Sequence, residues 1–277
     1  MRIRLSEPFE PEQWMQVLRR SCGAVLAMAC AVFPARAADL RVDYRITLAG
    51  LTLGSAELKA KLDADRYDLR MNAQLTGLAG LFTASGRGGA VATGSLGGNR
   101  PLSSGFSATG KSGSSERTVQ MALAAGNASE IRIEPPFEPR PDRVPIEDEH
   151  KKGILDPLSA VLGVVATKGG PGDPANCNRT LPVFDGTQRF NVVLTYASKR
   201  RVQKPGFSGE VLVCNARYIP VAGHRPERWA VKFMQDNRDI AVWLAPVEGT
   251  RVLVPFRIDL RTYFGISVVE AERWALE

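Results

Sequence analysis

Hydrophobic and polar residues alternate along much of the chain from residue 40 onward. In the segment 40–48, hydrophobic residues occupy every second position and polar residues lie between them. The segments 56–62 and 67–75 repeat this pattern after short polar breaks. A period of two places one side of an extended segment in a core and the other side in water. These three segments therefore predict antiparallel strands joined by tight turns.

The rest of the chain shows the same pattern less evenly. Further alternating segments predict strands at 119–123, 131–133, 190–196, 229–233, 240–244 and 252–260. Pro255 restricts the last of these to a sheet edge or a bulge, because proline cannot donate a ladder hydrogen bond. The segment 211–218 is hydrophobic on both faces, which predicts a strand in the middle of the sheet.

Two segments interrupt the alternation. Residues 84–115 are rich in glycine and serine, and we expect short curved strands there with a mobile tip near 110–115. The segment 134–145 carries prolines at 135, 136, 139, 141 and 145, so it predicts an exposed linker or a long loop. A division of the chain into two subdomains would fall at this loop.

One helix is predicted between Leu155 and Val165. Asp156 can cap it, Pro157 suits the first helical position and Gly169 can end it. A single apolar stripe is formed by Leu155, Leu158, Leu162 and Val165. We therefore predict that residues 38–277 form a single mainly β domain with one large, strongly curved antiparallel sheet, either a β-spiral or an open barrel-like sheet. It would have about 10–12 strands and one short helix packed on or in it. A sheet with that many strands must curl, which is why we expect strong curvature.

The first 37 residues carry the features of a secretory signal peptide. Two arginines precede the uncharged apolar segment 21–33, and Ala-Arg-Ala follows at 35–37. The apolar segment is shorter than the roughly 20 residues that span a bilayer. We expect export to the periplasm with cleavage near Ala37, whether translation starts at the first residue or at Met15, and no membrane span in the remainder. A buried core helix and a lipid anchor on Cys30 are the alternatives.

Two cysteines, Cys177 and Cys214, remain after the predicted signal peptide is removed. An even pair in an exported chain predicts a disulfide, and only one intramolecular pairing exists. A metal-binding or redox pair is the alternative, but the sequence contains no Cys-x-x-Cys motif. We predict no metal and no cofactor.

The composition adds limits on partners. With 277 residues, 44% hydrophobic and 23% charged, the chain is neither collagen-like, coiled-coil nor wholly disordered. Its net charge of +7 is modest, and an exported chain rarely meets nucleic acid, so no nucleic-acid partner is predicted. One basic turn is a candidate site for an anionic partner such as lipid phosphate or acidic glycan, and consists of Lys199, Arg200, Arg201 and Lys204. The alternative is a solubilising hairpin tip.

Catalytic motifs are scarce. Serine nucleophiles need a histidine base, and the chain has only His150, in a charged run, and His224, before a predicted strand. The sequence lacks nucleophile-elbow, zinc, phosphate-loop and dinucleotide motifs. We therefore predict a protein that is not an enzyme. The alternative is an envelope hydrolase acting on glycan or lipid, with paired carboxylates or His224 as its catalytic groups.

Several phrases, taken in order, resemble a known family. They are Tyr-Arg-Ile-Thr-Leu-Ala-Gly-Leu at 44–51 with Gly-Ser-Ala at 54–56, Tyr67, Gly-Leu-Ala-Gly-Leu-Phe at 77–82, Asp-Pro-Leu-Ser-Ala at 156–160, Cys177 ahead of Val-Phe-Asp-Gly at 183–186, Cys214 before Tyr218, and Thr-Tyr-Phe-Gly at 262–265. Together they resemble the exported proteobacterial family called domain of unknown function DUF3108, over nearly the whole mature chain. The resemblance implies a periplasmic β-rich protein and supplies no catalytic residues. The general plan also resembles the β-spiral envelope-integrity proteins of alphaproteobacteria, which have a curved sheet and a structural disulfide.

The functional expectation follows from the curved sheet. We expect a non-enzymatic periplasmic protein that supports the cell envelope by binding a protein partner or a lipidic or glycan ligand. Ligand pockets commonly form in the mouths of curved sheets. The predicted helix would either fill the concave face or gate it. An interior packed solid by side chains would exclude the ligand and favour the protein partner.

Overall fold

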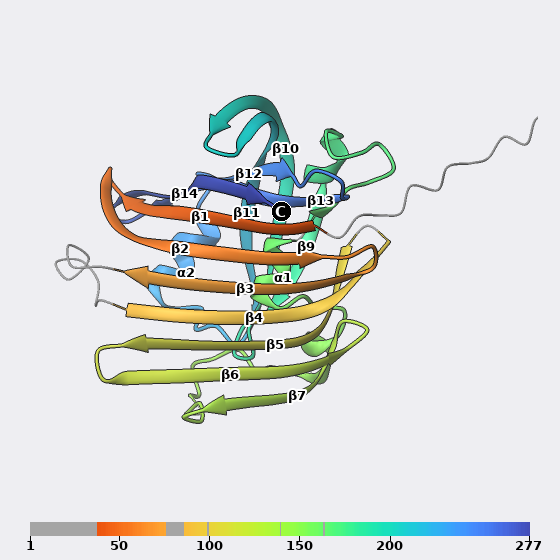
Figure 1. Ribbon diagram of the computed structural model, residues 1–277. Coiled ribbons are helices and arrows are strands. Elements are labelled where there is room, and N and C mark those ends of the chain that lie inside the picture. Colours follow the sequence, from red (N-terminus) through yellow and green to blue (C-terminus); the bar gives the residue numbers. More distant parts are fainter. Residues whose placement is uncertain (1–37, 76–85, 99, 139, 163) are drawn as a thin grey trace, which may run out of the picture. The chain divides into compact units, whose positions relative to one another are not determined.

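The computed structural model in Figure 1 describes residues 38–75, 86–98, 100–138, 140–162 and 164–277. These described residues form one compact unit. The predicted signal peptide at 1–37 and the Gly-Leu-Ala-Gly-Leu-Phe phrase at 77–82 lie outside the described residues.

Fourteen strands of the described chain belong to one antiparallel sheet. Their bounds are β1 (Ala38–Leu48), β2 (Leu51–Leu62), β3 (Arg66–Leu75), β4 (Gly86–Gly97), β5 (Arg100–Ser112), β6 (Ser115–Ala124), β7 (Asn127–Glu134), β8 (Val164–Val165), β9 (Arg179–Phe184), β10 (Arg189–Lys204), β11 (Phe207–Ala222), β12 (Ile240–Pro246), β13 (Val252–Thr262) and β14 (Gly265–Leu276). The helices are α1 (Pro157–Val161), α2 (Trp229–Asp236) and the 3₁₀ turns η3 (Asp148–Lys151) and η4 (Pro174–Cys177). The strand order is β7-β6-β5-β4-β3-β2-β1-β14-β13-β12-β11-β10-β9, and β8 pairs with β13.

The predicted mainly β fold with a large curved antiparallel sheet is confirmed. In β1, the alternation puts Leu40, Val42 and Tyr44 in the core and leaves Arg41 and Arg45 exposed. Strand β11 lies between β10 and β12, as its hydrophobic faces predict. The sheet has more strands than predicted, mainly because β9 and β14 were not recognised in the pattern. Strand β14 pairs with both β1 and β13, so it joins the first half of the sheet to the second.

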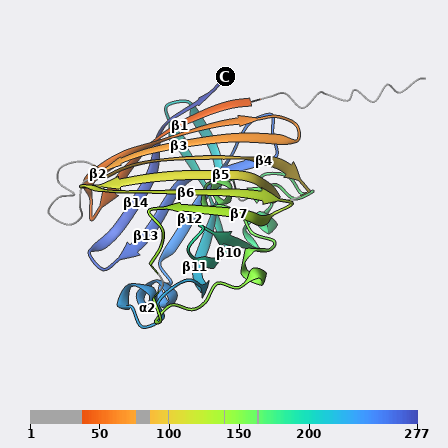
Figure 2. The ribbon, with the colours of Figure 1, turned by 90° about the horizontal axis from the view of Figure 1, so that it is seen from below.

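The sheet curls without closing. In Figures 1 and 2, β10 and β11 run across β2–β7 on the far side, and α1 lies between the two layers. The Tyr44 hydroxyl on β1 donates a 2.7 Å hydrogen bond to the Pro255 carbonyl on β13, past the intervening β14. Leu244 pairs with Pro255 and Trp243 with Arg257, so Pro255 lies beside a bulge in β13, and the bulge is the one of the two predicted alternatives that is confirmed. Strands β7 and β9 end the strand order and do not pair with each other within the described chain.

The glycine- and serine-rich segment forms long strands instead of the short ones predicted. Strands β4 and β5 have 12 and 13 residues and pair with each other along their lengths. Glycine weakens a strand interior, but β4 and β5 are each paired with a neighbouring strand on both sides, which completes their backbone hydrogen bonds. The small side chains instead shape the concave face.

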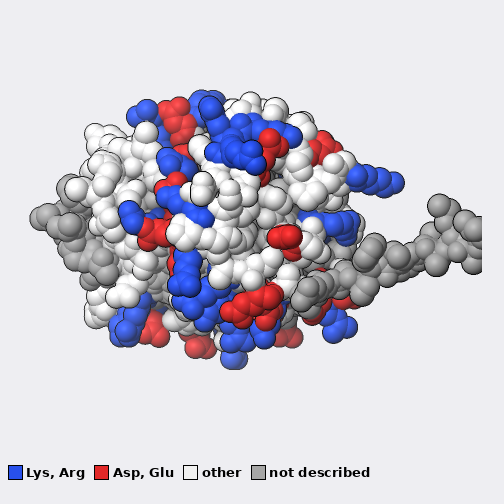
Figure 3. Space-filling view, turned by 45° about the horizontal axis from the view of Figure 1, so that its top comes forward, with Lys and Arg blue, Asp and Glu red and all other residues white. Residues whose placement is uncertain are grey.

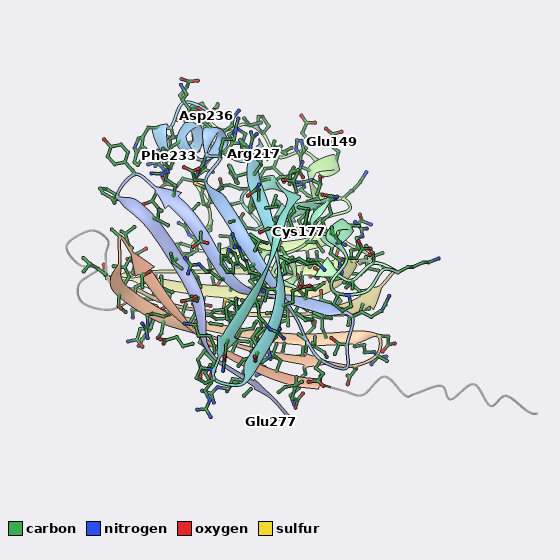
Figure 4. All side chains as sticks on the ribbon, turned by 90° about the horizontal axis from the view of Figure 1, so that it is seen from above. Glu149, Cys177, Arg217, Phe233, Asp236 and Glu277 are labelled. Atoms are coloured by element: carbon green, nitrogen blue, oxygen red, sulfur yellow. A yellow bond between two sulfur atoms is a disulfide. The ribbon has the colours of Figure 1, made fainter. Side chains whose placement is uncertain are left out.

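Both helices differ from the predictions. The segment 229–233 is the start of α2, not a strand, because three alternating residues do not distinguish the two periods and no residue of α2 is buried. Figure 4 shows Phe233 and Asp236 on this helix beside Arg217 of β11. Helix α1 has the predicted Asp156 cap and Pro157 start but only five residues. The two ends of its predicted apolar stripe lie outside the helix and pair with strands. Leu155 forms a β-bridge with Val183 of β9, and Val165 pairs with Val252 of β13.

The turn between β9 and β10 should be sensitive to side-chain size at Gly186. Gly186 has a φ of +92°, and a Cβ there would lie 2.7 Å from Cγ1 of Val119 on β6. Gly186→Ala should lower the free energy of unfolding by about 2 kcal/mol, because left-handed backbone strain adds to overpacking. Urea unfolding measures the loss.

Gly249 is the matched control. It also has a positive φ of 75°, but nothing lies within 4 Å of its added Cβ. Gly249→Ala should therefore lower the free energy of unfolding by less than Gly186→Ala, because it adds backbone strain without overpacking. Equal losses in the two variants would show that the turn does not pack tightly on β6.

Candidate functional site

The concave face of β3–β6 carries a row of small and medium hydrophobic side chains. Met71, Ala90, Ala108 and Val119 are successive cross-strand partners, so they lie side by side on one face. The two alanines in the middle extend least. They leave a hollow between the longer side chains at either end.

Helix α1 covers one side of this hollow, which we call the apolar pocket. Its volume is about 390 Å³. Beyond the row of four, it is lined by Phe106, Arg117, Phe137, Pro157, Leu158, Val161, Asp185 and Thr187. The helix therefore covers part of the concave face without filling it, and space remains for a ligand.

A buried polar network fixes α1 against the sheet. Oδ1 of Asp156 accepts hydrogen bonds from the N–H groups of Leu158 (2.9 Å) and Ser159 (2.8 Å). The Ser159 hydroxyl is 2.7 Å from the Tyr67 hydroxyl of β3. Burial raises the pKa of Tyr67 to about 12 and also raises the pKa of Asp156. The Asp-Pro-Leu-Ser phrase thus positions one wall of the apolar pocket.

A second hollow of about 380 Å³ adjoins the first and shares Arg117 and Phe137 with it. We call it the arginine pocket. Its lining consists of Arg117, Pro135, Pro136, Phe137, Glu138, Arg140, Arg143, Arg225 and Arg228. The proline-rich segment, which is the exposed loop predicted after β7, supplies six of these nine residues. The guanidinium carbons of Arg117 and Arg143 lie 4.9 and 4.2 Å from the centre of the Phe137 ring, which lines both pockets.

Two copies of Arg-Pro-acid-Arg, at 140–143 and 225–228, meet at the arginine pocket. Arg225 forms an ion pair with Asp142 of the other copy. Beside them, Val144 donates to the His224 carbonyl at 3.0 Å and Gly223 donates to the Val144 carbonyl at 2.8 Å. Our sequence interpretation missed this site. The repeated tetrapeptide was the one local signal, but only the fold brings its two copies together.

Positive charge accumulates around Arg143. Its guanidinium donates to the Gly223 carbonyl, while its buried Nε atom has no hydrogen-bond partner among the described residues. Burial lowers the pKa of Arg143, and the nearby charges of Arg140 and Arg225 lower it further. Cations therefore repel one another here, which an anion would relieve.

The basic turn predicted as an anion site is partly neutralised. Lys199 pairs with Glu210 at 3.0 Å and Lys204 with Glu270 at 3.3 Å. Arg200 and Arg201 lie on the same β10–β11 hairpin, and none of the four lines the apolar or arginine pocket. On the face shown in Figure 3, basic and acidic side chains lie next to one another.

Neither histidine lines the two pockets. His224 is 8% exposed, and burial lowers its pKa. His150 accepts the Glu147 N–H at 3.0 Å through Nδ1.

A groove on the opposite face of β1–β6 contains four carboxylates, including Asp43 and Glu57. Arg41 forms ion pairs with both Asp43 and Glu57.

The disulfide between Cys177 and Cys214 is confirmed. Both cysteines are fully buried, with Cα atoms 5.4 Å apart. The bond ties η4, which precedes edge strand β9, to β11 (Figure 4 labels Cys177). Within the described part of the chain, no cluster of three or more His, Cys, Asp or Glu residues could hold a metal ion. None of the described helices has the length and hydrophobicity of a membrane span.

Comparison with known proteins identifies the family. A family model described as "Protein of unknown function (DUF3108)" matches residues 43–272, which include the strands of both pockets and the disulfide. Searches of curated proteins and of solved structures found no match. Because the family model covers most of its length, the chain belongs to the DUF3108 family.

Proposed function

We propose that this protein is a non-enzymatic periplasmic protein that supports the cell envelope by binding a lipidic ligand in the apolar pocket. The observation that carries the proposal is the unfilled hollow between α1 and the row of small side chains on β3–β6. Its volume of about 390 Å³ lies within the range of roughly 300–1,000 Å³ that is usual for ligand sites. A chain of methylene groups suits such a wall, because each buried CH₂ contributes about 0.8 kcal/mol.

The proposed location rests on two observations. The first 37 residues have the pattern of a cleaved signal peptide, and the chain contains a buried disulfide. Disulfides persist mainly in oxidising compartments such as the periplasm. An envelope protein there would meet lipids directly.

Filling the hollow tests the proposal. The Ala90 side chain lines the apolar pocket, whereas its neighbour Val91 points to the opposite face and is 39% exposed. We expect the wild type to bind the neutral dye N-phenyl-1-naphthylamine saturably and to release it to 1-decanol. Ala90→Phe should weaken the binding of both ligands at least tenfold, because the new ring would occupy the cavity. Fluorescence titration measures this change in affinity.

Val91→Phe is the matched control and should bind like the wild type. It adds a ring to the same strand outside the cavity. Absence of saturable binding by the wild type, or unchanged binding by Ala90→Phe, would rule out the apolar pocket as the ligand site.

A further inference from the structure

We propose that the arginine pocket binds the phosphate of an alkyl or acyl phosphomonoester whose hydrocarbon chain lies in the apolar pocket. This inference rests on the proposed function, because it assigns the head group of the same ligand. The two pockets share Arg117 and Phe137, so one amphiphile can occupy both.

The charge balance of the arginine pocket favours an anion. Among its lining residues, Arg225 is paired with Asp142, and Glu138 is the lining carboxylate. The acidic member of the second tetrapeptide, Glu227, is held by Lys232 at 2.7 Å. Arg140 and Arg228 form no ion pair within the described part of the chain. Positive charge at this hollow therefore exceeds negative charge.

The surplus fits a phosphomonoester better than a carboxylate. A phosphomonoester carries about −1.5 to −2 charges at pH 7 and three acceptor oxygens, whereas a carboxylate carries one charge. One guanidinium group can bind two phosphate oxygens at once through parallel hydrogen bonds. Several arginines converge here from β6, the proline-rich loop and the start of α2. Within the described residues, the buried Nε atom of Arg143 has no hydrogen-bond partner, so the protein itself does not satisfy every guanidinium donor beside this pocket.

The position of Phe137 supports a ligand with two chemically distinct parts. Its ring lines both hollows and contacts two guanidinium groups. The apolar pocket is lined mainly by hydrocarbon from α1 and β3–β6, together with Arg117, Asp185 and Thr187, whereas the arginine pocket is lined mainly by arginine and proline. A chain that passes this ring moves from an apolar wall to a cationic one.

Matched ligands test the inference by calorimetry. Decyl phosphate, sodium decanoate and 1-decanol have the same chain length and differ in their head groups. We expect the wild type to bind decyl phosphate at least tenfold more tightly than 1-decanol and more tightly than decanoate. The preference should decrease at high salt, because ion pairs at a partly exposed site are screened.

A double variant isolates the head-group site. Arg140→Gln with Arg228→Gln should abolish the preference for decyl phosphate and leave 1-decanol binding unchanged. The Arg228 side chain makes no capping hydrogen bond to α2, so the fold should tolerate the change. Arg200→Gln with Arg201→Gln removes the same charge from the β10–β11 hairpin and should leave the preference intact.

The outcomes separate the two proposals. Failure of 1-decanol to bind would overturn the proposed function, and this inference with it. Equal affinity of the wild type for 1-decanol and decyl phosphate would overturn the inference alone. Inorganic phosphate tests the source of the anion: weak competition against decyl phosphate supports a lipid-borne phosphate, whereas competition at equal concentration would indicate a site for free phosphate and contradict the amphiphile.

Discussion

Replacing Cys177 and Cys214 together by alanine is expected to lower the free energy of unfolding by about 3 kcal/mol. The bond closes a loop with a sequence separation of 37 residues, so its loss restores much conformational freedom to the unfolded chain. It also releases η4 and the entry to edge strand β9 from β11. Urea unfolding should show a lower midpoint, and the thermal unfolding midpoint, Tm, should fall by about 10 °C for a domain of this size.

A reductant provides the control for this prediction. Dithiothreitol should destabilise the wild type toward the level of the double alanine variant and should leave that variant unchanged. A double variant with the wild-type midpoint would show that the bond adds nothing to the stability of the folded chain.

Asp156→Ala is expected to lower the free energy of unfolding by a similar amount, roughly 3 kcal/mol, because it leaves buried backbone N–H donors at the start of α1 without an acceptor. The Asp156 side chain is fully buried and accepts two backbone N–H bonds. Removing it should also loosen the α1 wall of the apolar pocket. Urea unfolding gives the stability, and the dye titration described above gives the effect on the pocket.

Asp156→Asn separates the cap from its charge. The amide oxygen can still accept the two N–H bonds, so most of the stability should remain at neutral pH. Burial raises the pKa of the wild-type carboxyl above its ordinary value of 3.8, so the folded chain holds this proton more tightly than the unfolded chain. The wild type should therefore lose stability as the pH rises from about 3.8 through the folded-state pKa, whereas Asp156→Asn lacks this loss. A stability difference between the two that does not change with pH would contradict this account.

The local pattern predicted much of the fold. Alternation along β1 and β3 gave the strands and their buried faces, and the Asp156–Pro157 pair gave the start of α1. Both are properties of neighbouring residues, which tertiary contacts reinforce here. The pattern failed for α2, which has no buried face to enforce a period.

The candidate site was hidden for a different reason. Its row of small side chains, including Ala90 and Ala108, becomes a cavity floor only through cross-strand register. The Arg-Pro-acid-Arg copies are joined by the Asp142–Arg225 contact, which spans 83 residues. Contacts at such separation depend on how the whole sheet curls.

The sequence by itself determined the β-rich class and the cap of α1, and it predicted the pairing of Cys177 with Cys214 as the one that remains if the predicted signal peptide is removed. These follow from residue period, local hydrogen bonding and a count of cysteines. Only the tertiary structure decided that β14 joins β1 to β13, that α1 ends after five residues, and that the apolar and arginine pockets adjoin. Each of these depends on backbone pairing and packing between distant segments, which the alternation along one segment does not encode.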